Sequence, residues 1–359
     1  MKMVRDALNF FRQDPKWGVL LASLTVIFVF LYFRAEEAGW KGRPHQALQK
    51  FQRAEDRLKT EISKSGGVVK FLEKRPALRW ALNLISLLLI GVILGGFVLD
   101  FFWFTRPGFR SRIQVSTGPP EARSWGLAAV LKTILLFIVG SMGLSILLAL
   151  VKSVVFRGTD ANPLILIHTT LSDLLCVGLV LHFVRQSPGR WRDLGFKCVR
   201  FWKDIWIGIA GYVAVLPIFI LTLLALLALI QFLSFEPPPH PLVEVFLEEE
   251  HSPLVIAYSI FLACVVGPVF EEIFFRGFFY PALKKRWGVA WGLVLSSVFF
   301  SAIHQNLFAF LPVFVLGLCL GYLYEKRGSL LSAIALHIVH NSVFILYFFL
   351  AKEVLTRGS

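Results

Sequence analysis

Long runs of apolar residues recur along the chain, separated by shorter polar segments. Most hold about 20 residues, the length that an α-helix needs to cross the hydrocarbon core of a bilayer. The runs are continuous rather than alternating, which argues against a membrane β-barrel. The pattern predicts an all-α fold, a polytopic transmembrane helical bundle with about nine spans and eight as the alternative. The predicted spans are residues 17–33, 80–104, 125–151, 163–184, 205–233, 253–275, 287–303, 307–323 and 329–350.

The longest polar segment, residues 34–79, carries twelve Lys and Arg against six acidic residues. Within it, apolar residues recur at near-helical spacing, and Ser65-Gly66-Gly67 supplies a stop. This spacing predicts a basic amphipathic helix at the membrane surface, with a solvated linker helix as an equal alternative. The apolar positions are Leu48, Phe51, Ala54, Leu58 and Ile62.

Composition and charge agree with a membrane protein. Hydrophobic residues make up 56% of the 359 residues, and the formal net charge is +14. The Lys and Arg residues lie in short loops between apolar runs, so an excess of positive charge on the cytoplasmic side and lipid headgroups explain them better than nucleic acid does. A multi-pass protein of a plasma or inner membrane, in contact with the lipid bilayer, is expected.

The charged loops also predict a topology. Residues 185–204 carry six Lys and Arg and are expected on the cytoplasmic side, whereas residues 234–252 carry five Glu and no Lys or Arg and are expected outside. Strict alternation then places the basic loop 34–79 outside, which conflicts with its charge. Long loops follow the charge rule less strictly, so the nine-span prediction is kept.

Two further features of the sequence narrow the function. The four cysteines are scattered without a Cys-x-x-Cys pair, which indicates neither a disulfide framework nor a sulfur-rich metal site. The first apolar run follows a basic start but no small-residue cleavage site, so a retained anchor helix is expected rather than a cleaved signal. Among polar residues inside spans, His168 and Asp173 are interpreted as structural hydrogen-bonding groups, with a buried polar cluster as the alternative.

Two adjacent carboxylates and a guanidinium end one of the most apolar stretches of the chain. Ionisable residues inside a membrane are costly and mark functional sites. On a helix, Glu272 and Arg276 lie four residues apart and can pair, whereas Glu271 points elsewhere. A carboxylate without a partner is free to act as a general base. The alternative is a pair of interfacial charges that cap a span.

Histidines and an asparagine follow on later helices. His304 ends one predicted span, and His337 and Asn341 lie four residues apart on one face of the last span. His340 lies close to that face, so the sequence leaves open whether His340 takes the place of His337.

This set of residues resembles the CPBP family of intramembrane proteases, which includes type II CAAX prenyl endopeptidases and lysostaphin resistance protein A-like proteins. The family pattern is E-E-x-x-x-R, F-x-x-x-H and H-x-x-x-[ND]. The chain has all three in order, as Glu271-Glu272-x-x-x-Arg276, Phe300-x-x-x-His304 and His337-x-x-x-Asn341. The resemblance covers residues 201–350 as a protease core. Residues 1–200 form an N-terminal region with about four transmembrane helices, and residues 351–359 form a tail.

The resemblance implies a set of roles. Glu271, helped by His304, would activate a water, while His337 and Asn341 would stabilise the oxyanion formed at a peptide carbonyl. Glu272 and Arg276 would give structural support. No metal or other cofactor is favoured, although Zn²⁺ is an alternative with Glu271, His304 and His337 as ligands. The substrate would be a peptide, or a prenylated or other membrane protein.

Two alternatives from other classes remain. Intramembrane Glu and His residues also carry protons or ions in transporters, although the two halves of the chain show no inverted repeat. A catalytically silent scaffold is the third hypothesis, which the intact motifs disfavour. The predicted spans also leave one conflict: Glu271 lies at the cytoplasmic end of the sixth span and His304 at the outer end of the seventh. A kink at Pro268 or an error in the span boundaries would remove it.

Overall fold

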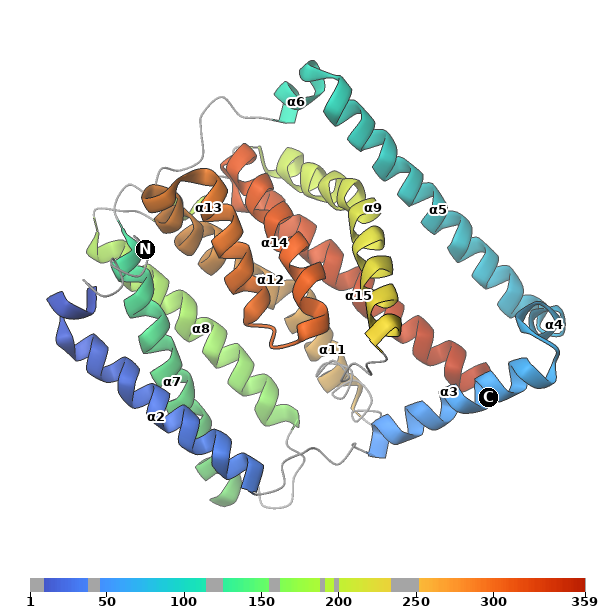
Figure 1. The fold of residues 1–359 in the computed structure, drawn as a ribbon, viewed down its shortest axis with the longest axis horizontal. Coiled ribbons are helices and arrows are strands. Elements are labelled where there is room, and N and C mark those ends of the chain that lie inside the picture. The colour runs from blue at the N-terminus through green and yellow to red at the C-terminus, as the bar shows by residue number, and fades with distance from the viewer. Residues whose placement is uncertain are drawn as a thin grey trace.

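The computed structural model describes residues 10–37, 46–113, 125–154, 162–187, 191–196, 200–233 and 252–358 (Figure 1). All regular elements in these ranges are helical, and seven helical stretches are long and apolar enough to cross a membrane. The prediction of an all-α, polytopic membrane bundle is confirmed. The long elements are α5 (Pro76–Thr105), α7 (Leu127–Val154), α8 (Asn162–Gln186), α9 (Phe201–Leu233), the stretch Pro253–Ala302, α14 (Leu307–Arg327) and α15 (Leu330–Gly358).

The N-terminal helix α2 (Pro15–Glu37) covers the first predicted span. Its described apolar part, Pro15–Ile27, is shorter than the seven long stretches. It lies beside α7, where the Lys132 ammonium sits 5.5 Å from the Trp17 ring centroid. The number of spans in the whole chain stays a prediction.

The stretch Pro253–Ala302 is two antiparallel helices rather than one span. It passes through α11 (Pro253–Phe261), the π-helical η3 (Leu262–Val266), α12 (Gly267–Glu272), the π-helical η4 (Ile273–Phe279) and α13 (Tyr280–Ala302). Gly288 breaks α13 at φ 80°, a conformation that favours glycine. The second half then folds back onto the first: the Phe275 and Phe300 rings lie 5.1 Å apart and the Phe279 and Phe299 rings 5.4 Å apart.

This hairpin corrects a predicted boundary and removes the depth conflict. The prediction that the sixth span ends at residue 275 is wrong, because the helix continues through Arg276 to the break at Gly288. Arg276 and Lys284 interrupted the apolar run in the sequence, but both are paired with carboxylates in the fold. Phe275 lies opposite Phe300, and the two helices run antiparallel. The residues that precede Phe275 therefore lie opposite the residues that follow Phe300. The two glutamates and His304 therefore lie at similar depth.

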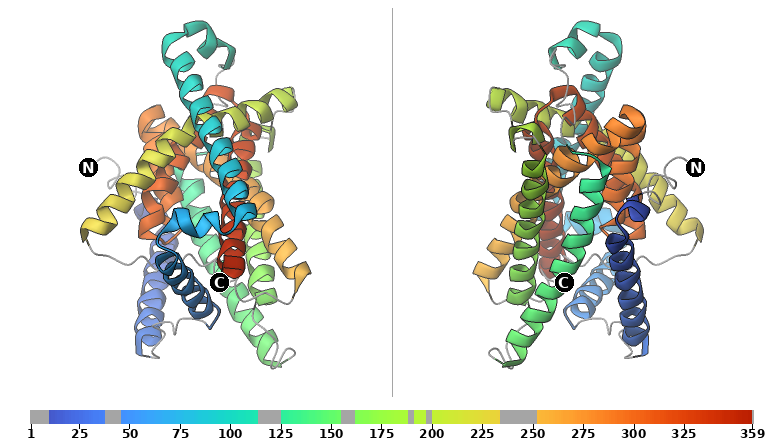
Figure 2. Two further views of the ribbon diagram at one scale, coloured as in Figure 1. Left: turned by 90° about the vertical axis from the view of Figure 1, so that its right-hand side faces the viewer. Right: turned by 90° about the vertical axis from the view of Figure 1, so that its left-hand side faces the viewer.

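Helices α9, α14 and α15 pack around the hairpin to form the C-terminal bundle (Figures 1 and 2). The main hydrophobic core lies here, with Phe278, Phe300, Leu320 and Leu336 almost fully buried. Helices α2, α7 and α8 lie on one side of this bundle and α5 on the other. The last helix continues beyond the predicted end at residue 350 to Gly358, so the predicted tail is largely helical.

Ion pairs close one end of the C-terminal bundle. Arg327 Nε donates to Asp204 Oδ1 at 2.9 Å, and Lys284 Nζ donates to Glu325 Oε1 at 2.8 Å. Tyr324 donates to the carbonyl of Leu194 in η1 (Trp191–Leu194) at 3.2 Å. The described part of the predicted cytoplasmic loop 185–204 thus meets the last residues of α14 at one end of the bundle. Which side of the membrane they occupy stays a prediction, and residues 234–251 of the predicted outer loop lie outside the described residues.

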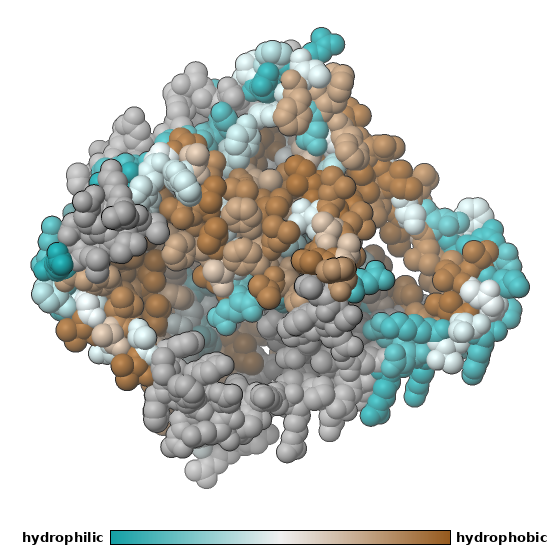
Figure 3. All heavy atoms as spheres, viewed as in Figure 1, coloured by the Kyte–Doolittle hydropathy of each residue, from teal (hydrophilic) through white to brown (hydrophobic). Residues whose placement is uncertain are grey.

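A corner of α3 (Gln46–Lys64), α4 (Val68–Glu73) and α5 stands at the edge of the molecule. The predicted helix and its stop are confirmed: Gly66 and Gly67 have φ of 81° and 110°. Arg75 joins the three helices, with Nη2 2.9 Å from Glu61 Oε2 and the guanidinium 4.0 Å from the Phe71 ring centroid. Figure 3 shows hydrophilic residues over this edge and apolar residues over the middle of the face.

Candidate active site

Glu272 is the most buried charged group of the site. It ends α12, is fully buried, and its Oε1 accepts a hydrogen bond of 2.8 Å from Arg276 Nη1. Arg276 also donates from Nη2 to the carbonyl of Gly317 at 3.1 Å, and its guanidinium lies 4.3 Å from the Phe300 ring centroid. The predicted pair is therefore present, and it is held between the hairpin and α14.

Glu272 has a second partner that the sequence did not indicate. Its Oε1 lies 3.0 Å from His337 Nδ1, which comes from α15 and is also buried. Because an ionised carboxylate only accepts hydrogen bonds, Nδ1 carries the proton and Nε2 faces the other way. A carboxylate that fixes the tautomer and orientation of an imidazole in this way is a recurring device of catalytic histidines.

Glu271 lies on the side of the His337 ring that faces away from Glu272. Its Oε2 is 3.8 Å from His337 Nε2, beyond hydrogen-bond length, and it has no hydrogen-bond partner among the described residues. The Glu271 side chain keeps 31% of its surface exposed, whereas that of Glu272 has none. The two carboxylates thus differ as predicted: one is paired and buried, and the other is uncommitted and accessible.

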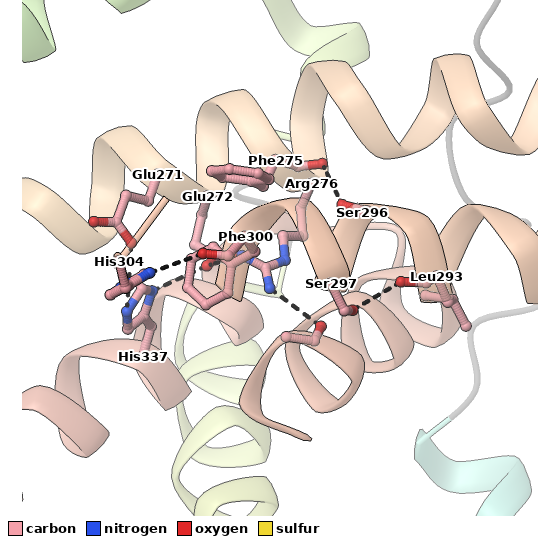
Figure 4. Close-up of polar contacts among 11 residues, drawn as sticks. Glu271, Glu272, Phe275, Arg276, Leu293, Ser296, Ser297, Phe300, His304 and His337 are labelled. Carbon is pink, nitrogen blue, oxygen red and sulfur yellow. Dashed lines mark hydrogen bonds and ion pairs between the residues drawn. The ribbon is translucent and has the colours of Figure 1, made fainter. Parts of the chain in front are cut away.

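His304 joins the same group from the end of α13 (Figure 4). Its Nδ1 donates to the carbonyl of Phe300 at 2.8 Å, which leaves Nε2 as an acceptor. The Phe300 ring contacts both imidazoles, with its centroid 5.1 Å from that of His304 and 5.7 Å from that of His337. Figure 4 shows Glu271, His304 and His337 together, with Arg276 and Ser297 on the other side of Phe300.

Asn341 points to the backbone of η3 and not to the two glutamates. Its Nδ2 donates to the carbonyl of Ala263 at 2.8 Å. In η3 the bonds run five residues back, since the N–H of Gly267 bonds to the carbonyl of Leu262. The next donor in that series would be Pro268, which has no N–H. Asn341 therefore supplies the donor that Pro268 lacks, and one amide hydrogen remains for another acceptor.

His340 faces a different helix from His337. Its ring lies 5.9 Å from that of Tyr212 and 5.3 Å from that of Phe219, both on α9. Its Nδ1 is buried without a hydrogen-bond partner among the described residues. His337, and not His340, is the imidazole that contacts both glutamates.

The two polar residues of α8 that the sequence marked have different surroundings. His168 Nε2 lies 2.8 Å from Ser145 Oγ of α7, as expected for a structural contact between helices. Asp173 instead lies within electrostatic range of Glu271. No spacing in the sequence could have related these two carboxylates, because they are brought together only by the packing of α8 against α12.

The zinc alternative has Glu271, His304 and His337 as its ligands. Zinc in catalytic sites commonly takes three protein ligands. Within the described ranges, no three His, Cys, Asp or Glu side chains are placed to hold a metal ion. His337 Nδ1 is also occupied by Glu272, so only its Nε2 faces Glu271.

The fold and the site define a class: a multi-pass integral membrane protein with a buried glutamate and histidine centre among its last helices. Residues 253–343 match the family model described as type II CAAX prenyl endopeptidase Rce1-like. The resemblance predicted from the three motifs is confirmed over these residues, which include all seven motif residues quoted from the sequence. The match supports intramembrane peptidase activity.

Two curated proteins are similar to the chain. An Escherichia coli protein described as "Uncharacterized 24.3 kDa protein" is 27% identical over 205 residues, which are 55% of this chain and 86% of that protein. The Bacillus subtilis (strain 168) "Putative membrane peptidase YdiL" is 28% identical over 91 residues, which are 25% of this chain and 37% of that protein. No solved structure matches the chain.

Proposed function

We propose that the protein is an intramembrane endopeptidase that hydrolyses a peptide bond of a membrane-associated or lipidated protein, by means of a water that Glu271 and His304 activate. One observation carries this proposal. Glu272 is held by Arg276 and His337, whereas Glu271 has a partly exposed side chain whose Oε2 lies 3.8 Å from His337 Nε2 without a hydrogen-bond partner among the described residues. A base needs a free, accessible carboxylate beside groups that can stabilise the developing charge.

In the proposed reaction, the water donates one hydrogen bond to Glu271 and one to His304 Nε2, the nitrogen left free by the bond to Phe300. Glu271 takes a proton as the water oxygen bonds to the peptide carbonyl carbon, and the carbonyl electrons move to its oxygen. When the carbonyl re-forms, the C–N bond breaks and the leaving nitrogen takes the proton from Glu271. Water has then been added across the peptide bond.

His337 is proposed to stabilise the oxyanion. With Nδ1–H bonded to Glu272, it can donate from Nε2 only as an imidazolium. In that form, Nε2–H donates a hydrogen bond to the new oxyanion. The remaining hydrogen of the Asn341 amide is proposed as a second donor.

Glu272 and Arg276 are proposed to act through His337 rather than on the substrate. The bond from Arg276 to the Gly317 carbonyl fixes η4 against α14, and the bond that Glu272 accepts from His337 fixes the imidazole. No step of this mechanism requires a metal ion, so cleavage is expected to persist after treatment with a chelator.

The test is cleavage of a proteome-derived peptide library by the purified full chain in detergent, with new peptide ends read by mass spectrometry. Glu271→Gln is expected to remove cleavage, on the order of a 1,000-fold loss. Glu73→Gln, the same substitution at an exposed position of α4, is the matched control and is expected to cleave normally. Full cleavage by a folded Glu271→Gln protein would contradict the proposal and move the transporter and scaffold hypotheses ahead.

A further inference from the structure

One face of α8 lies against the hairpin that carries the two glutamates. Tyr258 of α11 donates a hydrogen bond of 2.6 Å to Thr170 Oγ1, whose own hydrogen goes to the Leu166 carbonyl. Val177 packs against the main core. Thr170, Asp173 and Val177 are three and four residues apart, so they share this face. Asp173 is therefore directed to the hairpin between two positions with established contacts.

Asp173 and Glu271 are two partly exposed carboxylates at the proposed active site. They interact electrostatically, and the helices that carry them are packed together. Neither side chain is fully buried, since the side chain of Glu271 keeps 31% of its surface exposed. Two neighbouring carboxylates repel each other unless a proton or a positive group joins them.

Among the described residues, the positive groups of this centre are already engaged, since the His337 imidazolium of the proposed mechanism is bonded to Glu272. Arg276 is engaged by Glu272 and the Gly317 carbonyl. By contrast, the Oε2 atoms of Glu271 and Glu272 are buried and have no hydrogen-bond partner within the described ranges. Glu272 itself is fully buried, so its free oxygen is an independent sign that a donor is missing from this centre. The missing partner is a hydrogen-bond donor, because carboxylate oxygens only accept.

We propose that Asp173 is a specificity-determining residue that receives a Lys or Arg side chain of the substrate beside the bond that is cleaved. This inference rests on the proposed peptidase function. A cation at this position offsets the repulsion between Asp173 and Glu271 and leaves Glu271 to act on the water. The water supplies the donor for Glu271, which leaves Asp173 to receive the positive group of the substrate.

A basic side chain also suits the location of the site. Membrane proteins carry an excess of Lys and Arg next to their spans, and a positive charge that enters the apolar region needs a carboxylate partner. A peptide N–H would satisfy one acceptor but would leave the excess negative charge in place.

The test uses the proteome-derived peptide library and compares the residues that flank the cleaved bonds. The unaltered protein is expected to cleave sites with a nearby Lys or Arg about tenfold more often than their frequency in the library predicts, the worth of one hydrogen bond to a charged group. Asp173→Asn is expected to lose this preference and Asp173→Glu to keep it. Asp100→Asn is the matched control, because Asp100 is a partly buried carboxylate of α5 in range of Cys319.

The outcomes separate this inference from the proposed function. Cleavage that depends on Glu271 but shows no preference for basic residues overturns the inference alone. A preference that survives Asp173→Asn overturns it as well, as does an equal loss at basic and neutral sites, which would indicate a proton shared with Glu271. Absence of any cleavage by folded protein overturns the proposed function and the inference together. Thermal unfolding in detergent establishes that each variant is folded.

Discussion

Helices α5 and α15 are both long and apolar, yet they are held in the molecule by different means. In the most apolar window of α15, 33% of the residues are buried, against 6% in α5. Helix α15 is fixed by polar contacts, from His337 to Glu272 and from Asn341 to the Ala263 carbonyl. Helix α5 meets α9 through shape, where Gly96 lies against Val213 and Pro217.

This difference shows which part of the fold depends on specific polar contacts. A polar group buried inside a bilayer cannot form a hydrogen bond with water, so the loss of its protein partner is not compensated. A small residue at a helix crossing only has to stay small. Substitutions on the α15 side are therefore expected to affect both stability and catalysis, whereas those on the α5 side should affect packing alone.

The largest effect is expected at Arg276. Arg276→Met keeps the length of the side chain but leaves Glu272 as an uncompensated charge in the core, at a cost of about 3–5 kcal/mol. The measurement is thermal unfolding in detergent micelles, where a markedly lower Tm is expected. Lys132→Met on α7 is the control, since its ammonium lies beside Trp17 and pairs with no buried carboxylate in the described contacts. Equal Tm values for the two variants would show that the buried pair is not needed for the fold.

A smaller effect is expected at Asn341. Asn341→Leu is close in volume but leaves the Ala263 carbonyl without a donor, at a cost of about 1–3 kcal/mol. Cleavage should fall further than stability alone explains, because the proposed second oxyanion donor is also lost. The combined readout is Tm and cleavage rate on one preparation. An unchanged Tm would show that the π-helical segment does not rely on α15 for its missing hydrogen bond.

The smallest effect on the site is expected from α5. A Cβ at Gly96 would lie 2.5 Å from the Val213 carbonyl oxygen and 2.8 Å from Pro217 Cδ, so Gly96→Val forces the two helices apart. Overpacking of this kind costs about 1–3 kcal/mol. Easier proteolysis of the α5 region is expected, with cleavage of the peptide library retained. Loss of cleavage with an intact α5 contact would mean that α5 shapes the active site. The proposed difference between the α5 side and the α15 side would then be wrong.

Much of the fold could be predicted from the sequence because apolar runs alone determine helices in a bilayer. The error at residue 275 arose because Arg276 and Lys284 look like the end of a span, and only the fold shows that Glu272 and Glu325 pair with them. The pairing of Glu272 with Arg276 follows from helical spacing. Its bond to His337 does not, because it joins helices that are 65 residues apart.

Asn341 and Asp173 have contacts that could not be predicted from the sequence. The i,i+4 spacing places Asn341 beside His337, but its use by the Ala263 carbonyl depends on the π-helical turn before Pro268. Asp173 was interpreted as structural because no ligand spacing surrounds it. Its approach to Glu271 is a property of helix packing, which leaves no mark in the order of residues.

The central claim is that the two adjacent glutamates have separate tasks, Glu272 in holding the site and Glu271 in the chemistry. The direct measurement is the Tm and the cleavage rate of Glu271→Gln and Glu272→Gln, compared in one detergent. The account predicts an inactive Glu271→Gln protein with a Tm near that of the unaltered chain, and a clearly lower Tm for Glu272→Gln. A stable but inactive Glu272→Gln protein beside an active Glu271→Gln protein would contradict the account and reverse the two assignments.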